Sequence, residues 1–256
     1  MKKAGGIILF MILIATSTFA HDLVLIPEDQ KSVTIKFGHP QEFEAPDPDK
    51  LIRLNAYFDG EDAMVSLQRG ASKSTNDHIT INMSRYSHGH QVLFVSGEYD
   101  NGYFASDSAG KYFNTSKLHL PGSKDSGYFF KFAKAIFPAA TSGGSFSRNL
   151  GEQLEIVPQS DPFKTLPGQI FPVKVLYFGK PLAGIGVEIG DGQTKLKEEE
   201  IARYKTNTAG VALVRIARRG LQVIGVDYRT QPRFPQLSDH DDYGATLSFV
   251  LGHDAR

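Results

Sequence analysis

The stretch KSVTIKF, Lys31–Phe37, alternates polar and apolar side chains with a period of two. Successive side chains of a strand point to opposite faces of a sheet, so this pattern predicts a half-buried β-strand. Similar runs occupy residues 51–58, 78–83 and 91–99. Turn signals separate them, namely the prolines of EAPDPDK, the FDGED segment and YDNG. Strands at this spacing, with few helical stretches, favour an antiparallel sandwich.

The rest of the chain continues the pattern. SGYFFKFAKAIFPAA suits a strand buried on both faces that Pro138 ends, and later β-rich runs are joined by turns at 179–181, 207–210 and Gly220. The charged stretch at 194–205 fits a short helix or a solvated hairpin equally well. A Gly- and Ser-rich stretch at 141–151 is the best candidate linker. We therefore expect an all-β protein with two immunoglobulin-like antiparallel β-sandwich domains, at residues 21–150 and 151–256.

Residues 1–20 resemble a secretory signal peptide. Two lysines precede an apolar run of roughly ten residues, which is too short to span a bilayer comfortably. Thr18 and Ala20 are the small residues that a signal peptidase prefers, so cleavage would make His21 the N-terminus. No later segment has the length of a transmembrane helix. We expect a periplasmic protein without a membrane span after cleavage.

The composition and the absence of known catalytic motifs exclude several classes of function. The full chain has 28 basic and 28 acidic residues and no cysteine. Balanced charge gives no electrostatic footprint for nucleic acid, and thiolate is excluded as a metal ligand. No phosphate-binding loop, nucleophile elbow or HExxH helix is present. We therefore expect a non-enzymatic protein.

Histidines provide the candidate metal ligands. A free N-terminal His21 chelates through its amine and imidazole, with the Asp22 carboxylate beside it. His39 follows a predicted strand just before Pro40, and His240 lies among acids that include Asp241. His88 and His90, across a glycine, form a weaker candidate. Each histidine also has a simpler interpretation, as a strand end, a turn residue or part of an acidic surface loop.

Seven short strings carry a resemblance to a known family, and they occur in one order along the mature chain. They are HDLVLIP, FGHP, EYDNGYF, KFAKAIF, LEIVPQSDPF, GKPLAGIGVEI and SDHDDYGATLSF. The chain resembles the exported family of domain of unknown function 4198, which is associated with nickel and cobalt uptake systems. Many relatives carry Trp where this chain has Phe104. The second half also resembles prealbumin-like or carboxypeptidase-regulatory-like sandwiches, through the GKPLAG and TNTAG turns.

Together these features lead to one main hypothesis, a periplasmic protein that binds nickel or cobalt and assists metal uptake with a membrane transporter. His21, His39 and His240 would hold the ion, and Asp22 and Asp241 would support them or supply oxygen ligands. Copper and zinc suit the same nitrogen donors. Two alternatives stay open, a copper enzyme with a histidine brace that oxidises polysaccharides and a metal-free interaction module of the cell envelope.

Overall fold

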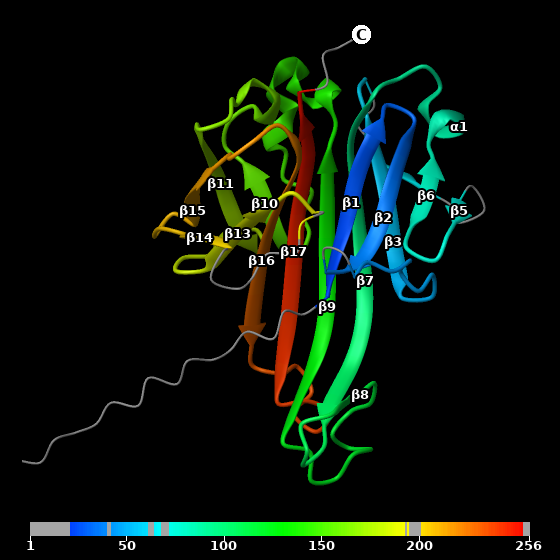
Figure 1. Cartoon of the computed structure of the whole chain (residues 1–256), viewed down its shortest axis with the longest axis vertical. Helices are drawn as coiled ribbons and strands as arrows, with labels where there is room; N and C mark the ends of the chain where they lie inside the picture. Colours follow the sequence, from blue (N-terminus) through cyan, green and yellow to red (C-terminus); the bar gives the residue numbers. More distant parts are fainter. Residues whose placement is uncertain are drawn as a thin grey trace, which may run out of the picture.

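The computed structural model describes residues 21–39, 42–60, 64–67, 72–192, 194 and 201–252. The predicted signal peptide and its cleavage site lie outside these residues. The described chain is nearly all β-structure (Figure 1). In this part of the chain, no helix is long and apolar enough to cross a membrane.

The central feature is a nine-stranded sheet in the order β14-β13-β16-β17-β9-β7-β3-β4, with β8 added on β7. Its strands are β3 (Leu51–Phe58), β4 (Met64–Ser66), β7 (Val92–Ser106), β8 (Tyr112–Phe113), β9 (Asp125–Ile136), β13 (Gly186–Gly190), β14 (Ala202–Lys205), β16 (Gly220–Thr230) and β17 (His240–Leu251). Strand β9 confirms the strand predicted for SGYFFKFAKAIF.

One parallel pairing joins the two halves of this sheet. Strand β17 runs parallel to β9, from His240 opposite Gly127 to Ser248 opposite Ala135. Every other strand pairing in the described part of the chain is antiparallel. Strands from both predicted domains therefore share one sheet. The division of the chain at residues 150 and 151 stays a prediction.

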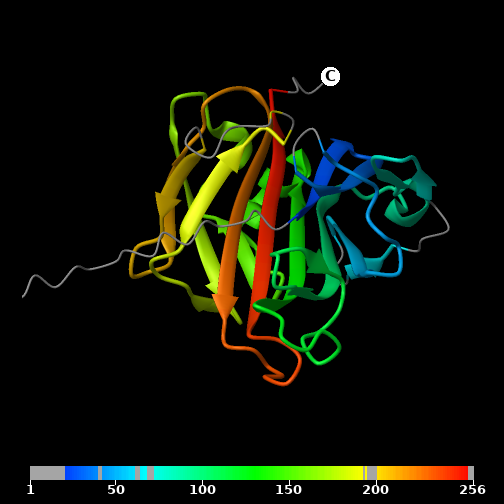
Figure 2. The same ribbon diagram turned by 60° about the horizontal axis from the view of Figure 1, so that its bottom comes forward.

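Two four-stranded sheets cover the two faces of the long sheet (Figure 2). One contains β1 (Asp22–Asp29), β2 (Ser32–Gly38), β5 (Ser72–Ser74) and β6 (Ile79–Asn82). The other contains β10 (Leu154–Pro158), β11 (Ile170–Tyr177), β12 (Lys180–Pro181) and β15 (Val211–Arg215).

The alternation of side chains along β9 explains why both faces are covered. Phe132 and Ile136 belong to the core shared with β10, β11 and β15. Ala133 and Ala135 belong to the core shared with β1, β2 and β6. A central strand with apolar side chains on both faces needs a covering layer on each, so the protein is a layered β-sandwich.

Strand β1 is tied to the long sheet by hydroxyl groups of β17. Thr246 Oγ1 donates a hydrogen bond to the Leu23 carbonyl at 2.6 Å. Ser248 Oγ donates in the same way to the Leu25 carbonyl. These carbonyls lie at the free edge of the small sheet, so the bonds satisfy backbone acceptors that would otherwise be buried without partners.

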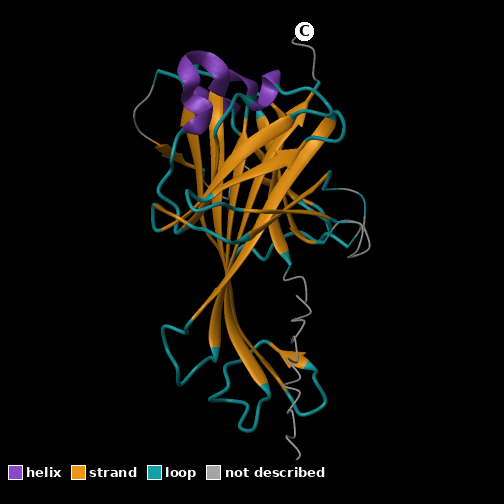
Figure 3. Cartoon of the chain, turned by 90° about the vertical axis from the view of Figure 1, so that its left-hand side faces the viewer, coloured by secondary structure: helices purple, strands orange, loops and turns teal. Residues whose placement is uncertain are grey.

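One expectation about a turn is wrong. The predicted turn at Asn101 and Gly102 is a bulge inside β7, where Gly102 has a φ of +85°. A glycine supplies this backbone conformation without strain, so the strand continues and β7 and β9 reach far along the molecule (Figure 3). The predicted linker at 141–151 overlaps the end of the 3₁₀ segment η2 (Pro138–Ser147), and its role as a domain boundary stays a prediction.

The remaining segments are the charged stretch at 194–205 and two short helical elements. Strand β14 pairs with β13, which favours the hairpin interpretation for the end of the charged stretch, while residues 195–200 lie outside the described chain. The remaining short elements are α1 (Ser84–Ser87) and the 3₁₀ segment η3 (Pro162–Lys164).

A buried ionic cluster lies between the long sheet and β10. Lys134 and Glu155 form an ion pair in which each side chain is only 1% exposed. Glu155 also accepts hydrogen bonds from the backbone N–H groups of Leu150 and Gly151 at 2.8 and 3.1 Å. Glu152 is buried beside them, and its Oε1 has no hydrogen-bond partner. Burial raises the pKa of Glu152 to about 8, although the Lys134 ammonium acts against this rise.

This arrangement predicts a pH-dependent stability. The pKa of Glu152 is higher in the folded protein than in the unfolded chain, so its contribution is fully present below pH 4.5 and is lost as pH rises toward 8. We expect the free energy of unfolding to fall less between pH 5 and pH 8.5 in Glu152→Gln than in the wild type, by up to about 4 kcal/mol. Urea unfolding at pH 5 and pH 8.5 measures the difference. The exposed Glu28→Gln control should follow the wild type, and equal pH dependence in all three proteins would contradict the prediction.

Candidate functional site

His21 and His39 lie together because of the register between β1 and β2. Asp22 pairs with Gly38 and Leu23 pairs with Phe37, so the residues just beyond this end of the hairpin meet across it. The two imidazole rings are stacked, with centroids 4.9 Å apart and an angle of 25° between their planes. Two histidines 18 positions apart in the sequence therefore form one pair of nitrogen donors.

Neighbouring aromatic rings fix the position of the pair. His21 also stacks on Phe37 with centroids 5.4 Å apart, and Phe37 contacts Tyr99 of β7 at 4.5 Å. Phe37 and Tyr99 are buried in the core. The exposed His21 ring therefore rests on a rigid aromatic base, which limits the positions that the ring can adopt.

The loop that carries His39 requires a glycine before it. Gly38 has a φ of +126°, and a Cβ atom there would approach the Glu42 carbonyl oxygen to 2.8 Å. The loop is closed by two backbone hydrogen bonds between Phe37 and Glu44, at 3.0 and 2.9 Å. The His39 carbonyl accepts a further hydrogen bond from the Glu42 N–H at 2.9 Å. The backbone of Phe37 to His39 thus holds the His39 imidazole at the end of β2.

Asp22 connects this end of β1 to a buried lysine. Lys131 of β9 is 1% exposed, and its Nζ lies 3.1 Å from Asp227 Oδ1 and 3.8 Å from Asp22 Oδ1. The lysine side chain occupies the space beside Gly244, where any Cβ atom would collide with it. The Asp22 carboxyl is therefore turned toward β9 and β16 and supports the start of β1.

The electrostatics of this group follow from its burial. Burial raises the pKa of Asp22 to about 7, and the nearby Lys131 ammonium lowers it only in part. Burial also acts to lower the pKa of Lys131, but the attraction of Asp227 and Asp22 holds this pKa above its usual value. Asp227 is the nearer carboxylate, so we assign it as the main counter-charge of the lysine.

His240 does not join the pair. Its Nε2 lies 3.1 Å from Asp125 Oδ1, and its Nδ1 lies 3.1 Å from Asp242 Oδ2 with an angle that falls short of a hydrogen bond. Burial acts to lower the pKa of His240, but Asp242 raises it above its usual value. Thr246 bonds to the carbonyl of Leu23 and Ser248 to that of Leu25, so β1 and β17 run in the same direction. His21 therefore lies near position 244, about four residues or roughly 13 Å from His240 along β17. The three predicted imidazoles therefore do not converge.

The other residues predicted to bind the metal also lie away from the His21–His39 pair. Asp241 is buried, and its Oδ2 accepts a hydrogen bond from Arg233 Nε at 3.1 Å. His88 and His90 are exposed and follow α1, where His90 Nδ1 lies 3.5 Å from Asp59 Oδ1. Within the described residues, no group of three or more His, Asp or Glu side chains is arranged to hold a metal ion.

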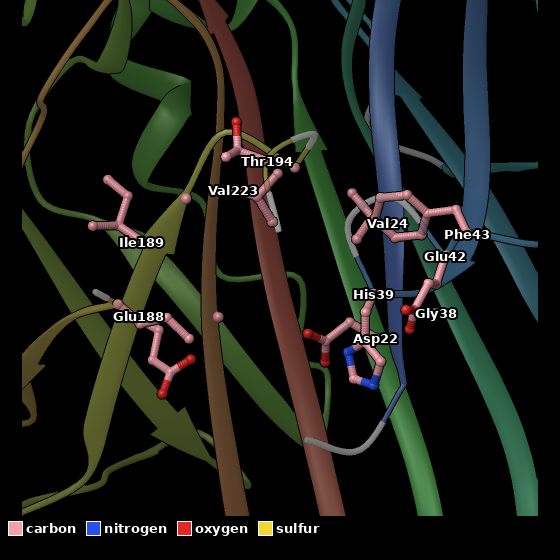
Figure 4. Close-up of a pocket in the computed structure, with 14 residues that line it drawn as sticks. Asp22, Val24, Gly38, His39, Glu42, Phe43, Glu188, Ile189, Thr194 and Val223 are labelled. Carbon is pink, nitrogen blue, oxygen red and sulfur yellow. The ribbon is translucent and has the colours of Figure 1, made fainter. Parts of the chain in front are cut away.

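A pocket of about 340 Å³ lies beside the pair, between β1 and the loop after β2 on one side and the strands β13 and β16 on the other. Asp22, Val24 and His39 line one side, and Thr194 and Val223 line the other (Figure 4). Sequence reasoning missed this pocket and the buried Lys131. The lysine had one usable signal, because KFAKAIF places a charged residue inside an apolar strand.

The buried ammonium yields a stability prediction. Asp227→Asn removes the nearer counter-charge of the buried Lys131, but the Asp227 carboxylate itself is 62% exposed, so we expect a loss of about 1–3 kcal/mol in the free energy of unfolding. The matched control is Glu188→Gln, which breaks a partly exposed pair with Arg203 on the adjacent strand and should cost about 1 kcal/mol or less. Urea denaturation measures both variants. Similar losses in both would contradict the proposed importance of Asp227.

The comparison with known proteins gives a family and no annotated relative. No curated protein matches the chain closely enough to count as a relative. A family match covers residues 18–230, from just before His21 to the end of β16, and so includes the His21–His39 pair and Lys131. The chain belongs to the family described as Domain of unknown function (DUF4198).

Proposed function

We propose that this protein binds a divalent transition-metal ion, nickel or cobalt, in the periplasm and assists its uptake. The observation that carries the proposal is the stacked pair of His21 and His39 imidazoles at one end of the small sheet. Imidazole nitrogen is a preferred donor for nickel, cobalt, copper and zinc. The association of the resembled family with nickel and cobalt uptake supports the choice of metal.

In the proposed site one ion would be bound by one nitrogen of each ring. Metal–imidazole nitrogen distances are about 2 Å, so two nitrogens on one ion lie roughly 3–4 Å apart. The ring centroids are 4.9 Å apart and the rings are stacked, so at least one ring would have to turn for a nitrogen of each to reach the same ion. The third donor would be the α-amino group that cleavage after Ala20 creates on His21. Asp22 would support the site from outside, because its carboxyl faces Lys131.

The proposed donor set is smaller than the set expected from the sequence. His240 and Asp241 belong to separate polar clusters on β17, and we assign them no contact with the ion. The proposed site therefore consists of one amine and two imidazoles. Delivery of the ion to a membrane transporter remains part of the proposal, and the resembled family's association supports it.

An oxidative copper enzyme is the less favoured alternative. The same donors would accept copper, but such an enzyme needs a flat surface beside the metal for a polysaccharide. In the described part of the chain, the exposed large aromatic side chains are Tyr112, Phe113, Phe178 and Phe234. Tyr112 and Phe113 form β8 beyond the far end of β7, and none of the four lines the pocket beside His39. Peroxide-dependent cleavage of a polysaccharide by the copper-loaded protein would favour the enzyme.

The amine ligand gives the first prediction for binding. Protein that begins at His21 should bind nickel about 10- to 100-fold more tightly than protein with one extra alanine before His21, because the extension moves the amine away from the imidazole. Isothermal titration with nickel chloride at pH 7.5 measures both. Equal affinity would show that the amine is not a ligand.

A set of histidine variants tests the ring pair separately. We expect His39→Ala to weaken nickel binding at least about 10-fold, whereas His240→Asn and the exposed His88→Ala should bind like the wild type. Calorimetry on the cleaved protein measures all three. A loss in His240→Asn equal to that in His39→Ala would reject the proposed site.

The metal-free interaction module makes a different prediction. Nickel at 100 times its dissociation constant should stabilise the folded protein by about 2.7 kcal/mol if binding is specific to the native state. Thermal unfolding with and without nickel measures this. An unchanged melting temperature for the cleaved protein would favour the metal-free module.

A further inference from the structure

Two loops form one end of the molecule, beyond the part of the long sheet that the small sheets cover. The loop at residues 107–124 joins β7 to β9 and contains β8, and the loop at residues 231–239 joins β16 to β17. Both lie at the lower end in Figure 1, below the labelled strands of the two small sheets, and Figure 3 shows the same end from another side. We call these two loops the tip.

The tip exposes large apolar side chains. Tyr112 and Phe113 of β8 are 45% and 38% exposed, Leu118 is 58% exposed, and Phe234 of the second loop is 51% exposed. Single exposed apolar side chains are common on protein surfaces, whereas a group of them on neighbouring loops indicates a contact surface. The tip therefore has the character of a surface that binds a partner.

Hydrogen bonds join the two loops, so this surface is preformed. The Lys117 N–H donates to the Leu237 carbonyl at 3.0 Å, and Lys117 Nζ lies 2.6 Å from Asp239 Oδ1. The Tyr112 hydroxyl donates at 2.7 Å to Asp125 Oδ2, at the start of β9. A partner need not order the loops before it binds, which lowers the entropic cost of the contact.

The charge of the tip differs from that of the whole chain. The two loops contain four basic and two acidic residues, whereas the full chain contains 28 of each. Two basic groups have acidic partners, because Lys117 pairs with Asp239 and Arg233 pairs with Asp241 of β17. The second acid, Asp107, accepts two backbone N–H groups of its own turn at 2.9 and 3.0 Å. The positive excess is therefore carried by the other two lysines of the tip.

These two lysines, Lys111 and Lys124, lie beside the apolar side chains. Lys111 precedes β8 directly, and its Nζ is 5.1 Å from the centroid of the Phe113 ring. The Lys124 N–H donates to the Ser106 carbonyl at 3.1 Å, and Ser106 faces Tyr112 across the β7–β8 pairing. Positive charge and exposed aromatic rings therefore occupy the same part of the tip.

This combination suits a lipid surface better than a protein surface. At a membrane–water interface, aromatic and aliphatic side chains enter the lipid while neighbouring lysines extend their ammonium groups to the headgroups. Protein–protein interfaces are depleted in lysine and bury about 800 Å² on each partner. Because the tip adds positive charge to its apolar groups, anionic headgroups are the complementary ones.

We propose that the tip binds the surface of a bilayer that contains anionic phospholipid, with Phe113, Leu118 and Phe234 inserted among the headgroups. This inference goes beyond the proposed function and does not depend on metal binding. It also gives the metal site an orientation. Strands β1 and β17 run in the same direction, so His21 lies at the end of β1 nearer to the tip and would face the membrane.

Sedimentation with sucrose-loaded vesicles tests the inference. The protein begins at His21, because the apolar leader would bind lipid by itself, and no metal is added. We expect vesicles of phosphatidylcholine with phosphatidylglycerol to bind it at least about tenfold more tightly than phosphatidylcholine alone, and high salt to weaken this binding. Equal binding to both vesicle types, or no binding to either, would overturn the inference.

Matched charge variants separate a contact at the tip from a general effect of net charge. Lys111→Glu with Lys124→Glu changes the charge of the tip, whereas Lys31→Glu with Lys73→Glu makes the same change at two exposed lysines of the sheet that contains β1. We expect the tip variant to bind anionic vesicles at least about tenfold more weakly than the wild type, and the control to stay within about twofold. Equal losses in both would count against the tip.

Tryptophan is absent from the chain, which allows insertion to be measured directly. Phe234→Trp places a fluorophore in the tip. Leu213→Trp places one at a similarly exposed position on β15, opposite Pro172 of β11 and away from the tip. With anionic vesicles we expect the emission of Phe234→Trp to shift to the blue and to be quenched by brominated phosphatidylcholine. The emission of Leu213→Trp should not change.

Two further outcomes would reject a membrane contact. The first is unchanged emission of Phe234→Trp under conditions in which the wild type sediments with the vesicles. The second is a wild-type dimer in sedimentation velocity that Phe234→Ser abolishes while it still binds vesicles, which would assign the tip to a second copy of the chain. Melting temperatures show that each variant is folded under the assay conditions.

Discussion

The parallel pairing of β17 with β9 is the constraint on which the rest of the structure depends. It joins strands that lie more than 100 residues apart in the sequence into one sheet, and this sheet supports a smaller sheet on each face. It also presents the Thr246 and Ser248 hydroxyls to the carbonyls of β1. The location of His21 follows from this contact, since His21 is the residue just before β1.

Three sets of contacts meet at the site. The β1–β2 register brings two imidazoles together, Phe37 and Tyr99 support them from the core, and Lys131 holds the neighbouring carboxyl of Asp22 from below. A buried ammonium between carboxylates is costly to form and is retained only with good geometry. This arrangement links the start of β1 to β9 and β16.

Local patterns predicted much of the fold and only part of the site. Alternation identified β2, β3 and β6, because a half-buried strand leaves a period-two signal. The bulge at Gly102 was taken as a turn, since a glycine with positive φ serves both structures. His21 and His39 were both selected, and their meeting follows from a hairpin register that one sequence does not reveal. His240 was grouped with them because no local signal reports how far along β17 it lies from β1.

The hydroxyl contacts between β1 and β17 have a consequence for the order of folding. Thr246 lies 223 positions after Leu23, so the first described strand reaches its final position only after the last strand has been synthesised. Contacts of such large sequence separation form late and slow the search for the native state. The β1–β2 hairpin that carries His21 and His39 therefore packs onto the long sheet only in a late step of folding.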